Sequence, residues 1–248
     1  MEGYDASTYG ERMAEVYDTW HDHQGWYRET DATVEALVEL AGDGPVLELA
    51  IGTGRIGLPL AERGLEVHGI DASESMVSKL REKPGADRIQ VTIGNFADVG
   101  VDGRYSLIFV VFNTFFALGT QEEQIRCFEN VGGRLTDGGV FVIEAFVPEP
   151  ERFAGDVNVS RVDADLVQLN MSVVDRAAQT SESQHVVLTA SGARFYPVRI
   201  RWAYPSELDL MARLAGMRLR ERWSSWSREP FTKTSSKHVS LYELLPDA

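Results

Sequence analysis

The chain is poor in cysteine and in basic residues. One cysteine, Cys127, among 248 residues leaves no internal disulfide and argues against a cysteine-rich metal site, so we expect no bound metal. With 24 Lys and Arg against 38 Asp and Glu, the formal charge is −14. Phosphate-rich partners must be neutralised by clustered basic residues, so we expect neither a nucleic-acid nor a membrane partner.

Long apolar runs and a secretory leader are also missing. The longest apolar stretch, Leu107 to Leu118, is interrupted by Asn113 and Thr114 and is about half the length of a membrane span. The first residues are polar and acidic, whereas a secretory leader is basic and then apolar. We therefore expect a soluble cytoplasmic protein with one large domain or a domain plus a lobe.

The middle of the chain alternates short apolar runs with segments of helical periodicity. Strands are expected at residues 46–50, 66–70, 89–93, 105–112 and 140–145, and helices at 56–61, 73–82 and 122–135. Such alternation is typical of a parallel sheet with helical crossovers. The predicted fold class is α/β, a Rossmann-like, doubly wound sheet.

The pattern changes on both sides of this region. Apolar residues at positions 9, 13, 16, 17 and 20 predict one N-terminal helix, and 30–40 predicts a second. Strand-like alternation at 165–174, 185–190 and 193–202, with turns at 179–183 and 191–192, predicts an inserted antiparallel lobe. A last helix (207–215) and two strands (218–226 and 238–244) bring the mostly parallel sheet to seven strands.

We divide the chain into four parts on these grounds. They are N-terminal lid helices (1–44), a ligand-binding core (45–147), the antiparallel insert (148–203) and a C-terminal helix with two strands that completes the core (204–248).

A glycine loop follows the first expected strand. The run from Gly52 through Arg55 to Gly57 matches the dinucleotide-binding fingerprint, which is weak evidence on its own. Asp71 follows Gly54 by 17 residues, at the end of the second strand, where a carboxylate can accept hydrogen bonds from a ribose. The combination indicates a nucleoside ligand, and both NAD and S-adenosylmethionine (SAM) carry an adenosine.

Glu48, just before the glycines, favours SAM. A carboxylate there would repel the pyrophosphate of NAD, whereas it suits the ammonium and the sulfonium of SAM. A charged residue inside an apolar strand is costly unless it is paired.

These residues carry a family resemblance. Glu48 to Gly54 resembles the acidic-x-Gly-x-Gly-x-Gly motif of class I SAM-dependent methyltransferases, with Ala50 where the family usually has glycine. His68 to Met76 resembles their second motif. The insert before the last helix is similar to that of the amino-sugar and glycine N-methylating branch. The resemblance implies in-line transfer of a methyl group to an N, O or C atom of a small molecule, with S-adenosylhomocysteine (SAH) as the other product.

The resemblance also implies roles for individual residues. Glycines of the loop approach the methionine moiety, Asp71 holds the ribose, and the side chains at 72, 76, 95 and 96 surround the adenine. Tyr17 closes over the cofactor. The cofactor-binding set is Glu48, Ala50, Gly52, Gly54, Arg55, Asp71, Ala72, Met76, Asn95, Phe96 and Phe112, with Asn113 beside the sulfonium and Phe115 and Phe116 just beyond.

A general base is needed only to take a proton from the acceptor. Histidine titrates nearest neutrality, and His21, in the aromatic N-terminal segment, is the expected base together with Tyr17. His23 and His185 are further candidates, whereas His68 and His238 are expected to be packed.

Some alternatives remain open on the sequence. The arginines of the insert (161, 176, 194, 199 and 201) fit an anionic-substrate handle, a solvated face or a homodimer contact. Trp223, Trp226, Arg228 and Phe231 fit a wall of the acceptor pocket. The competing functions are a cyclase-like or inactive SAM-binding protein, and an NAD-dependent oxidoreductase.

Overall fold

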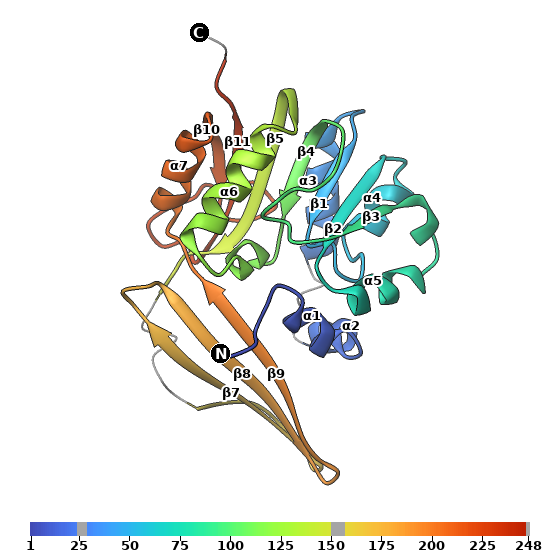
Figure 1. Cartoon of the computed structure of the whole chain (residues 1–248), viewed down its shortest axis with the longest axis vertical. Helices are drawn as coiled ribbons and strands as arrows, with labels where there is room; N and C mark the ends of the chain where they lie inside the picture. The colour runs from blue at the N-terminus through green and yellow to red at the C-terminus, as the bar shows by residue number, and fades with distance from the viewer. Residues whose placement is uncertain (24–28, 150–156, 247–248) are drawn as a thin grey trace.

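Two sheets organise the molecule (Figure 1). The computed structural model describes residues 1–23, 29–149 and 157–246, with the side chains of 21–23 excepted. Sheet A has the order β10-β11-β5-β4-β1-β2-β3, and sheet B has the order β6-β7-β8-β9. The strands of sheet A are β1 (Val46–Leu49), β2 (Val67–Asp71), β3 (Gln90–Ile93), β4 (Tyr105–Val110), β5 (Leu135–Phe146), β10 (Met217–Trp223) and β11 (Lys237–Leu244).

Sheet A confirms the predicted fold class. Strands β1 to β5 pair in parallel, and β11 is antiparallel to both β5 and β10. Because β1 pairs with β2 on one side and β4 on the other, the strand order reverses there. Ligands bind at such a switch point, outside the carboxyl ends of the strands.

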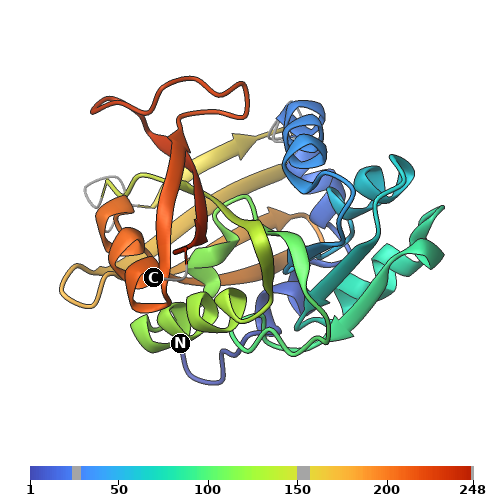
Figure 2. The same ribbon diagram turned by 90° about the horizontal axis from the view of Figure 1, so that it is seen from above.

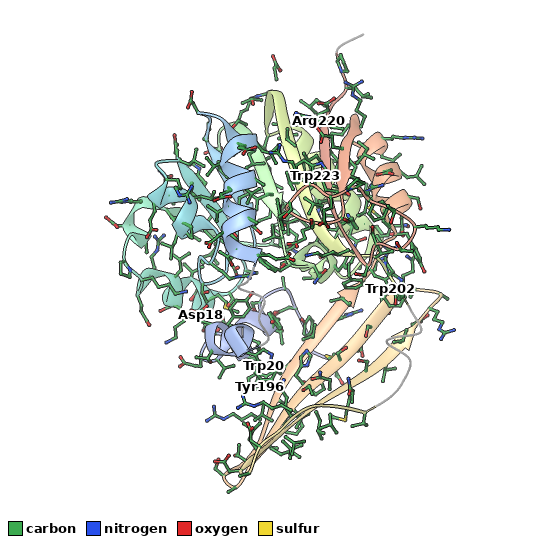
Figure 3. The ribbon with its side chains drawn as sticks, turned by 180° about the vertical axis from the view of Figure 1, so that it is seen from behind. Asp18, Trp20, Tyr196, Trp202, Arg220 and Trp223 are labelled. Atoms are coloured by element: carbon green, nitrogen blue, oxygen red, sulfur yellow. The ribbon has the colours of Figure 1, made fainter. Side chains whose placement is uncertain are left out.

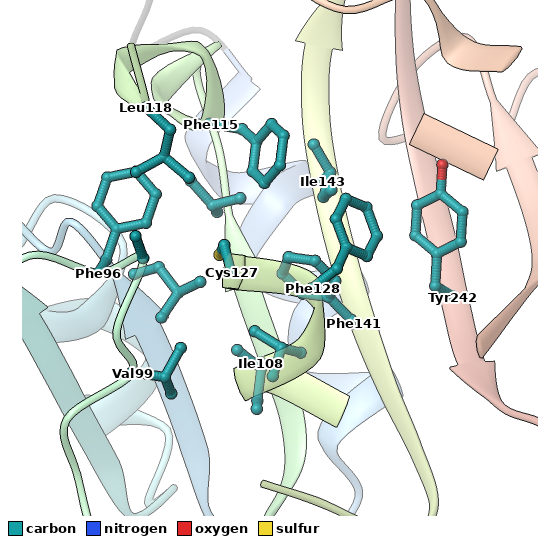
Figure 4. Close-up of a cluster of buried hydrophobic side chains, with 14 of the residues drawn as sticks. Phe96, Val99, Ile108, Phe115, Leu118, Cys127, Phe128, Phe141, Ile143 and Tyr242 are labelled. Carbon is teal, nitrogen blue, oxygen red and sulfur yellow. The ribbon is translucent and has the colours of Figure 1, made fainter. Parts of the chain in front are cut away.

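Helices cover both faces of sheet A. One face packs against α6 (Gln121–Gly132) and α7 (Pro205–Leu214), through a cluster in which Phe128, Phe141 and Tyr242 are fully buried (Figure 4). The other face packs against α3 (Thr30–Ala41) and α4 (Gly57–Glu62), through Leu37 and Leu60. A further helix, α5 (Glu74–Arg81), follows β2. Ser73 caps the start of this helix, because the Met76 N–H donates to Oγ of Ser73 (3.1 Å).

Some element ends differ from the prediction. Strand β4 stops at Val110 rather than at 112, because Phe112 and Asn113 adopt left-handed φ angles of 58° and 67°. Helix α6 ends at Gly132, and β5 already begins at Leu135. Strand β10 ends at Trp223 instead of 226.

Sheet B forms a lobe that lies beneath the core in Figure 2. Its antiparallel strands are β6 (Asn158–Val162), β7 (Leu166–Asp175), β8 (Thr180–Thr189) and β9 (Gly192–Arg201). The prediction missed β6 and wrongly placed the β7–β8 turn at 179–183. The turn lies at 176–179, where Oδ1 of Asp175 accepts the N–H groups of Ala177 and Ala178. An Asx turn of this kind is invisible to hydrophobic periodicity.

The predicted single N-terminal helix was wrong. The segment forms two short helices, α1 (Thr8–Met13) and α2 (Tyr17–His23), which together we call the lid. The break arises because the Val16 N–H donates to the carbonyl of Met13 (2.9 Å), three residues back. Of the predicted apolar residues, Met13 is buried and the other four are partly buried, packed in one cluster with Tyr196 of the lobe. Figures 1 and 3 show it between the core and β9.

Arg201 ties the lobe to the core. Its guanidinium is buried and donates to Oε1 of Glu207 (2.7 Å) and to Oε1 of Gln124 (2.6 Å). The two readings of Arg201 as a solvated residue or a substrate handle were therefore wrong. No helix within the described ranges is long and apolar enough to cross a membrane.

Candidate functional site

A cavity of about 630 Å³ opens where the carboxyl ends of sheet A meet the lid and the lobe. Nine residues predicted to bind the cofactor or close over it line this cavity: Tyr17, Ala50, Gly52, Asp71, Ala72, Met76, Asn95, Phe96 and Phe112. A smaller cavity of about 20 Å³ adjoins it, and Glu48 and Arg55 line that one. Tyr17, Ala50 and Phe112 line both, so the two form one continuous site.

Asp71 is held at the centre of the site by backbone groups. The Gly52 N–H donates to Oδ2 (2.7 Å) and the Ser73 N–H donates to Oδ1 (2.8 Å). Burial raises the pKa of Asp71, and these two N–H groups oppose the rise. Each carboxylate oxygen accepts more than one hydrogen bond, so Asp71 can shape the loop and still receive ribose hydroxyls.

The glycine loop places left-handed residues in close succession. Ala50, Gly52 and Gly54 have φ angles of 57°, 57° and 80°. A Cβ on Gly54 would lie 2.9 Å from Cδ1 of Leu80, so this glycine permits close packing of the loop on α5. Gly52 lines the cavity, where a missing side chain exposes backbone to a ligand.

Ala50 carries strain that glycine would relieve. A left-handed conformation costs a non-glycine residue about 1–2 kcal/mol. We expect Ala50→Gly to raise the free energy of unfolding by about 0.5–1 kcal/mol, after the greater flexibility of glycine in the unfolded chain is counted. Denaturant unfolding measures the change. Ala36→Gly, in the interior of α3, is the matched control and should lower stability; a destabilised Ala50→Gly variant would contradict the expectation.

The smaller cavity holds groups of both charges. Burial raises the pKa of Glu48 well above its usual value, and the nearby Arg55 opposes that rise. Oε2 of Glu48 is buried and has no hydrogen-bond partner among the described residues. The Arg55 guanidinium lies 3.1 Å from the centre of the Phe112 ring. A buried carboxyl with one oxygen that lacks a donor, beside a guanidinium, fits the ammonium and the carboxylate of an amino acid, so these residues fit the methionine end of SAM.

Glu144 fixes the turn that follows β4, and sequence reasoning missed it. Its Oε2 accepts the Phe112 N–H (3.1 Å), and its carbonyl accepts the Asn113 N–H (3.1 Å). The Phe146 N–H donates in turn to Oδ1 of Asn113 (2.6 Å). Together these bonds hold two consecutive left-handed residues at the cavity wall. The sequence did contain a signal for this role, because Glu144 is the one acidic residue in the apolar run 140–146 of β5.

The predicted adenine end contains a second acid that sequence reasoning missed. Oδ1 of Asn95 accepts the Ala97 N–H (2.9 Å) and so caps a turn, while its Nδ2 donates to Oε1 of Glu123 (3.4 Å). Glu123 lines the same cavity, which places a carboxylate next to Asn95 and Phe96. Phe115 and Phe116, predicted just beyond the sulfonium side of the site, are fully buried in the core and do not line the cavity.

The lid is fastened to both cofactor-binding loops. Asp18 accepts the Thr53 hydroxyl (2.6 Å) and pairs with Nζ of Lys83 (2.7 Å). Glu11 accepts the Ser73 hydroxyl (2.7 Å), and this bond together with those from Ser75 lowers the pKa of Glu11. These contacts bring Tyr17 over the junction of the two cavities.

The remaining predicted residues lie elsewhere. The side chains of His21 and His23 fall outside the described part of the structure. His68 and His238 have structural partners, Oη of Tyr105 (2.7 Å) and Oγ of Ser240 (2.8 Å).

The predicted acceptor wall near the C-terminus was wrong. Trp223 and Trp226 pack into the hydrophobic core, and Arg228 pairs with Glu39. Neither tryptophan lines the main cavity. The side of that cavity opposite sheet A is formed instead by the lobe, with Asn170, His185 and Ile200.

Known proteins resemble this chain in sequence and in structure. Residues 46–139 match the family described as a methyltransferase domain. The cypemycin N-terminal methyltransferase of Streptomyces sp is 29% identical over 242 residues, which cover 96% of this chain and 98% of that protein. The CcbJ methyltransferase from Streptomyces caelestis is 39% identical and superposes with a TM-score of 0.87, covering 98% of this chain and all of that one.

A more distant structure shares the fold. The SAM-bound amino pentose methyltransferase from Micromonospora echinaspora, which acts in calicheamicin biosynthesis, superposes with a TM-score of 0.68 at 19% identity, over 91% of this chain and 96% of that one. None of these similarities favours the nicotinamide-dependent or the non-methylating alternatives.

Proposed function

This chain belongs to the class I SAM-dependent methyltransferases, and we propose that its acceptor is an amine nitrogen of a small molecule or of a peptide amino terminus. The observation that carries the proposal is a set of three aromatic side chains, Tyr9, Tyr17 and Trp20, that line the cavity from the lid. Aromatic faces attract ammonium groups. The names of two similar proteins, an N-terminal methyltransferase and a sugar N,N-dimethyltransferase, support the same acceptor atom.

Different residues of the site bind different parts of SAM. We propose that Glu48 receives the ammonium and Arg55 the carboxylate of the methionine end, while Asp71 receives the ribose hydroxyls. Ala72, Met76 and Phe96 enclose the adenine, whose amino group faces Asn95 and Glu123. When bound, SAM supplies an activated methyl group for in-line transfer and leaves as SAH.

The remaining residues of the predicted site position the reacting atoms. Ala50, Gly52 and Gly54 set the path of the loop, and Phe112 forms the wall next to it. Tyr17, which lines both cavities, excludes water over the methyl group. Much of the rate then comes from orientation, which well-placed reactants supply at effective concentrations of up to roughly 10⁵–10⁸ M. A role for His21 as base stays a prediction.

The proposed function is tested with deuterated SAM and paired acceptors. The panel contains a short alanyl peptide with a free amino terminus, an amino sugar and benzylamine, each beside its hydroxyl counterpart. We expect trideuteromethyl transfer to at least one amine, stoichiometric SAH and no transfer to the hydroxyl partner. Methylation confined to hydroxyl acceptors, or SAM binding without SAH from any acceptor, would contradict it.

We also propose that the lobe mediates a homodimer. One face of sheet B, away from the cavity, carries Val159, Leu169 and Phe195 in a cross-strand row that also contains the buried Val186. Phe195 is 55% exposed and Val159 53% exposed. Three strands of ten residues and one of five present roughly 550 Å², about two thirds of the ~800 Å² that each partner contributes to a stable dimer.

Sedimentation velocity tests the dimer. We expect the native chain to sediment at twice its 27.6 kDa mass, and Phe195→Lys with Val159→Lys to sediment as a monomer. Leu210→Lys, on α7 with 57% exposure, is the matched control and should leave the dimer intact. A monomeric native chain would overturn this proposal and leave the proposed reaction untouched.

Two further assignments are proposals of the same kind. We propose a cytoplasmic location, which suits a chain whose one cysteine, Cys127, is buried as a free thiol. We also propose that the four parts 1–44, 45–147, 148–203 and 204–248 act as lid, cofactor-binding core, acceptor-side insert and core completion.

A further inference from the structure

The lobe places one histidine in the cavity wall. His185 on β8 lies between Asn170 on β7 and Tyr196 on β9, and the three face the same side of sheet B. Nδ1 of His185 is 2.5 Å from Oδ1 of Asn170. The Trp20 ring of the lid packs edge-on against both His185 and Tyr196, with centroid distances of 6.0 and 5.3 Å. Figure 3 shows Trp20 and Tyr196 side by side.

The contact with Asn170 defines the state of the ring. A carboxamide oxygen accepts hydrogen bonds and does not donate them, so Nδ1 of His185 carries the proton. The other ring nitrogen, Nε2, therefore keeps its lone pair in neutral histidine. Trp20 and Tyr196 restrict the ring on the lid side and on the neighbouring strand. The result is an oriented imidazole with a basic nitrogen. It lies in the lobe wall of the cavity, opposite the residues proposed to bind SAM.

Charged groups near this histidine are engaged elsewhere. Glu182 on β8 faces the opposite side of sheet B and pairs with the amino terminus of the chain. On α2, Asp18 pairs with Lys83 on the core side of the lid. On β9, Tyr196 is the direct titratable neighbour, and the exposed Arg194 lies two residues earlier on the same face; β7 offers the uncharged Asn170. Burial lowers the pKa of His185, which leaves the imidazole neutral at pH 7.

The geometry points to His185 as the group that accepts the proton of the methyl-acceptor ammonium, with Asn170 as its positioning residue. This inference rests on the proposed function, because it deepens the role of the same cavity. An ammonium nitrogen has no lone pair, so it must lose a proton before it can form a bond to carbon. That proton passes to Nε2 of His185 and gives an imidazolium.

The balance of the reaction is then complete. The freed lone pair forms the nitrogen–carbon bond as the carbon–sulfur bond breaks, and sulfur keeps the electron pair. The acceptor ammonium loses one proton and gains one methyl group, so the methylated product carries the same single positive charge as the ammonium did. The imidazolium returns its proton to solvent before the next turnover.

A first test follows the ring itself, without turnover. In protein labelled with ¹³C at the histidine Cε1 atoms, His185→Gln assigns the resonance in the SAH complex. We expect a pKa below the ordinary 6.5, the Nδ1-protonated form at pH 7.5, and a shift on addition of benzylamine. An imidazolium at pH 7.5, or a resonance that saturating benzylamine leaves unmoved, would overturn the inference.

A second test measures the pH dependence of methyl transfer to the fastest amine of the panel. His185→Gln should lower kcat by about 10²–10⁴-fold and abolish the acidic limb of the profile, with SAM affinity unchanged. Asn170→Asp should move that limb to higher pH by about one unit or more, because a carboxylate stabilises the imidazolium. Thr189→Ala, at the exposed end of β8, should match the native enzyme.

The outcomes separate this inference from the proposed function. If His185→Gln keeps kcat within threefold and His21→Gln abolishes the limb, the base is His21 and the inference falls while amine methylation stands. If no amine is methylated, the proposed function fails, and the benzylamine response of His185 still decides whether the ring meets an amine.

Discussion

Asp71→Ala is expected to weaken SAM binding by about 10²–10⁴-fold. The variant loses the acceptor for the ribose hydroxyls and releases the N–H groups of Gly52 and Ser73, which shape the loop. Hydrogen bonds to a charged group contribute roughly 1.5–3 kcal/mol each, and each 1.4 kcal/mol is about tenfold in affinity. Calorimetric titration with SAM and with SAH measures the loss.

Two further variants locate the cause of that loss. Asp71→Asn keeps one acceptor oxygen and should lose about tenfold, whereas Asp87→Ala, on the surface after α5, should bind normally. Thermal melting of each variant without ligand separates a damaged fold from a damaged site. Near-native SAM affinity in a folded Asp71→Ala variant would remove Asp71 from the proposed site.

Glu207→Ala is expected to lower the free energy of unfolding by about 3 kcal/mol. Arg201 is 6% exposed and pairs with Glu207 at 2.7 Å. Removing one partner leaves an uncompensated buried charge, which costs about 3–5 kcal/mol; we take the lower end because Glu207 is partly exposed. Glu243→Ala, which breaks the more exposed pair with Arg218, is the control and should cost about 1 kcal/mol or less.

The same pair gives a pH dependence with a defined sign. Burial raises the pKa of Glu207, but hydrogen bonds from Arg201, Gln179 and Gln121 outweigh it, so the net pKa lies below the ordinary 4.5. A carboxyl with a lowered folded pKa stabilises the fold above pH 4.5 and loses that contribution as the pH falls through the folded value. Acid unfolding of Glu207→Ala should therefore be less steep than that of the native chain. Equal steepness would contradict the assignment.

The glycine loop and Asp71 were predictable because their geometry is local. A strand, a glycine turn and an acid at the end of the next strand occupy fixed positions in any parallel sheet of this kind. Glu48 was predictable because a charged residue inside an apolar strand is costly unless a partner of opposite charge is bound to it. None of these positions depends on a contact with a distant part of the chain.

The supporting groups were not predictable because they come from far along the chain. Glu11 contacts Ser73 across 62 residues, and Glu144 contacts Phe112 across 32. Nothing in the local pattern of an acid on a short helix says which loop it will meet.

The lobe shows a second kind of limit. Its antiparallel strands were predictable from side chains that alternate between apolar and polar. The position of β6, however, depends on its pairing with β7, and that of the β7–β8 turn on the side chain of Asp175. The pairing of Asn170 with His185 depends on the same register, so the sequence could name His185 as a candidate base but gave no reason to prefer it to His21. Here, hydrophobic periodicity predicts the architecture and leaves the polar contacts open.

A crystal structure of the SAH complex tests the central claim most directly. We expect the ribose on Asp71, the adenine between Met76 and Phe96, the amino-acid end at Glu48 and Arg55, and the sulfur facing a space that continues to His185. SAH bound with its ribose away from Asp71, or with its sulfur closed off from the lobe, would contradict it.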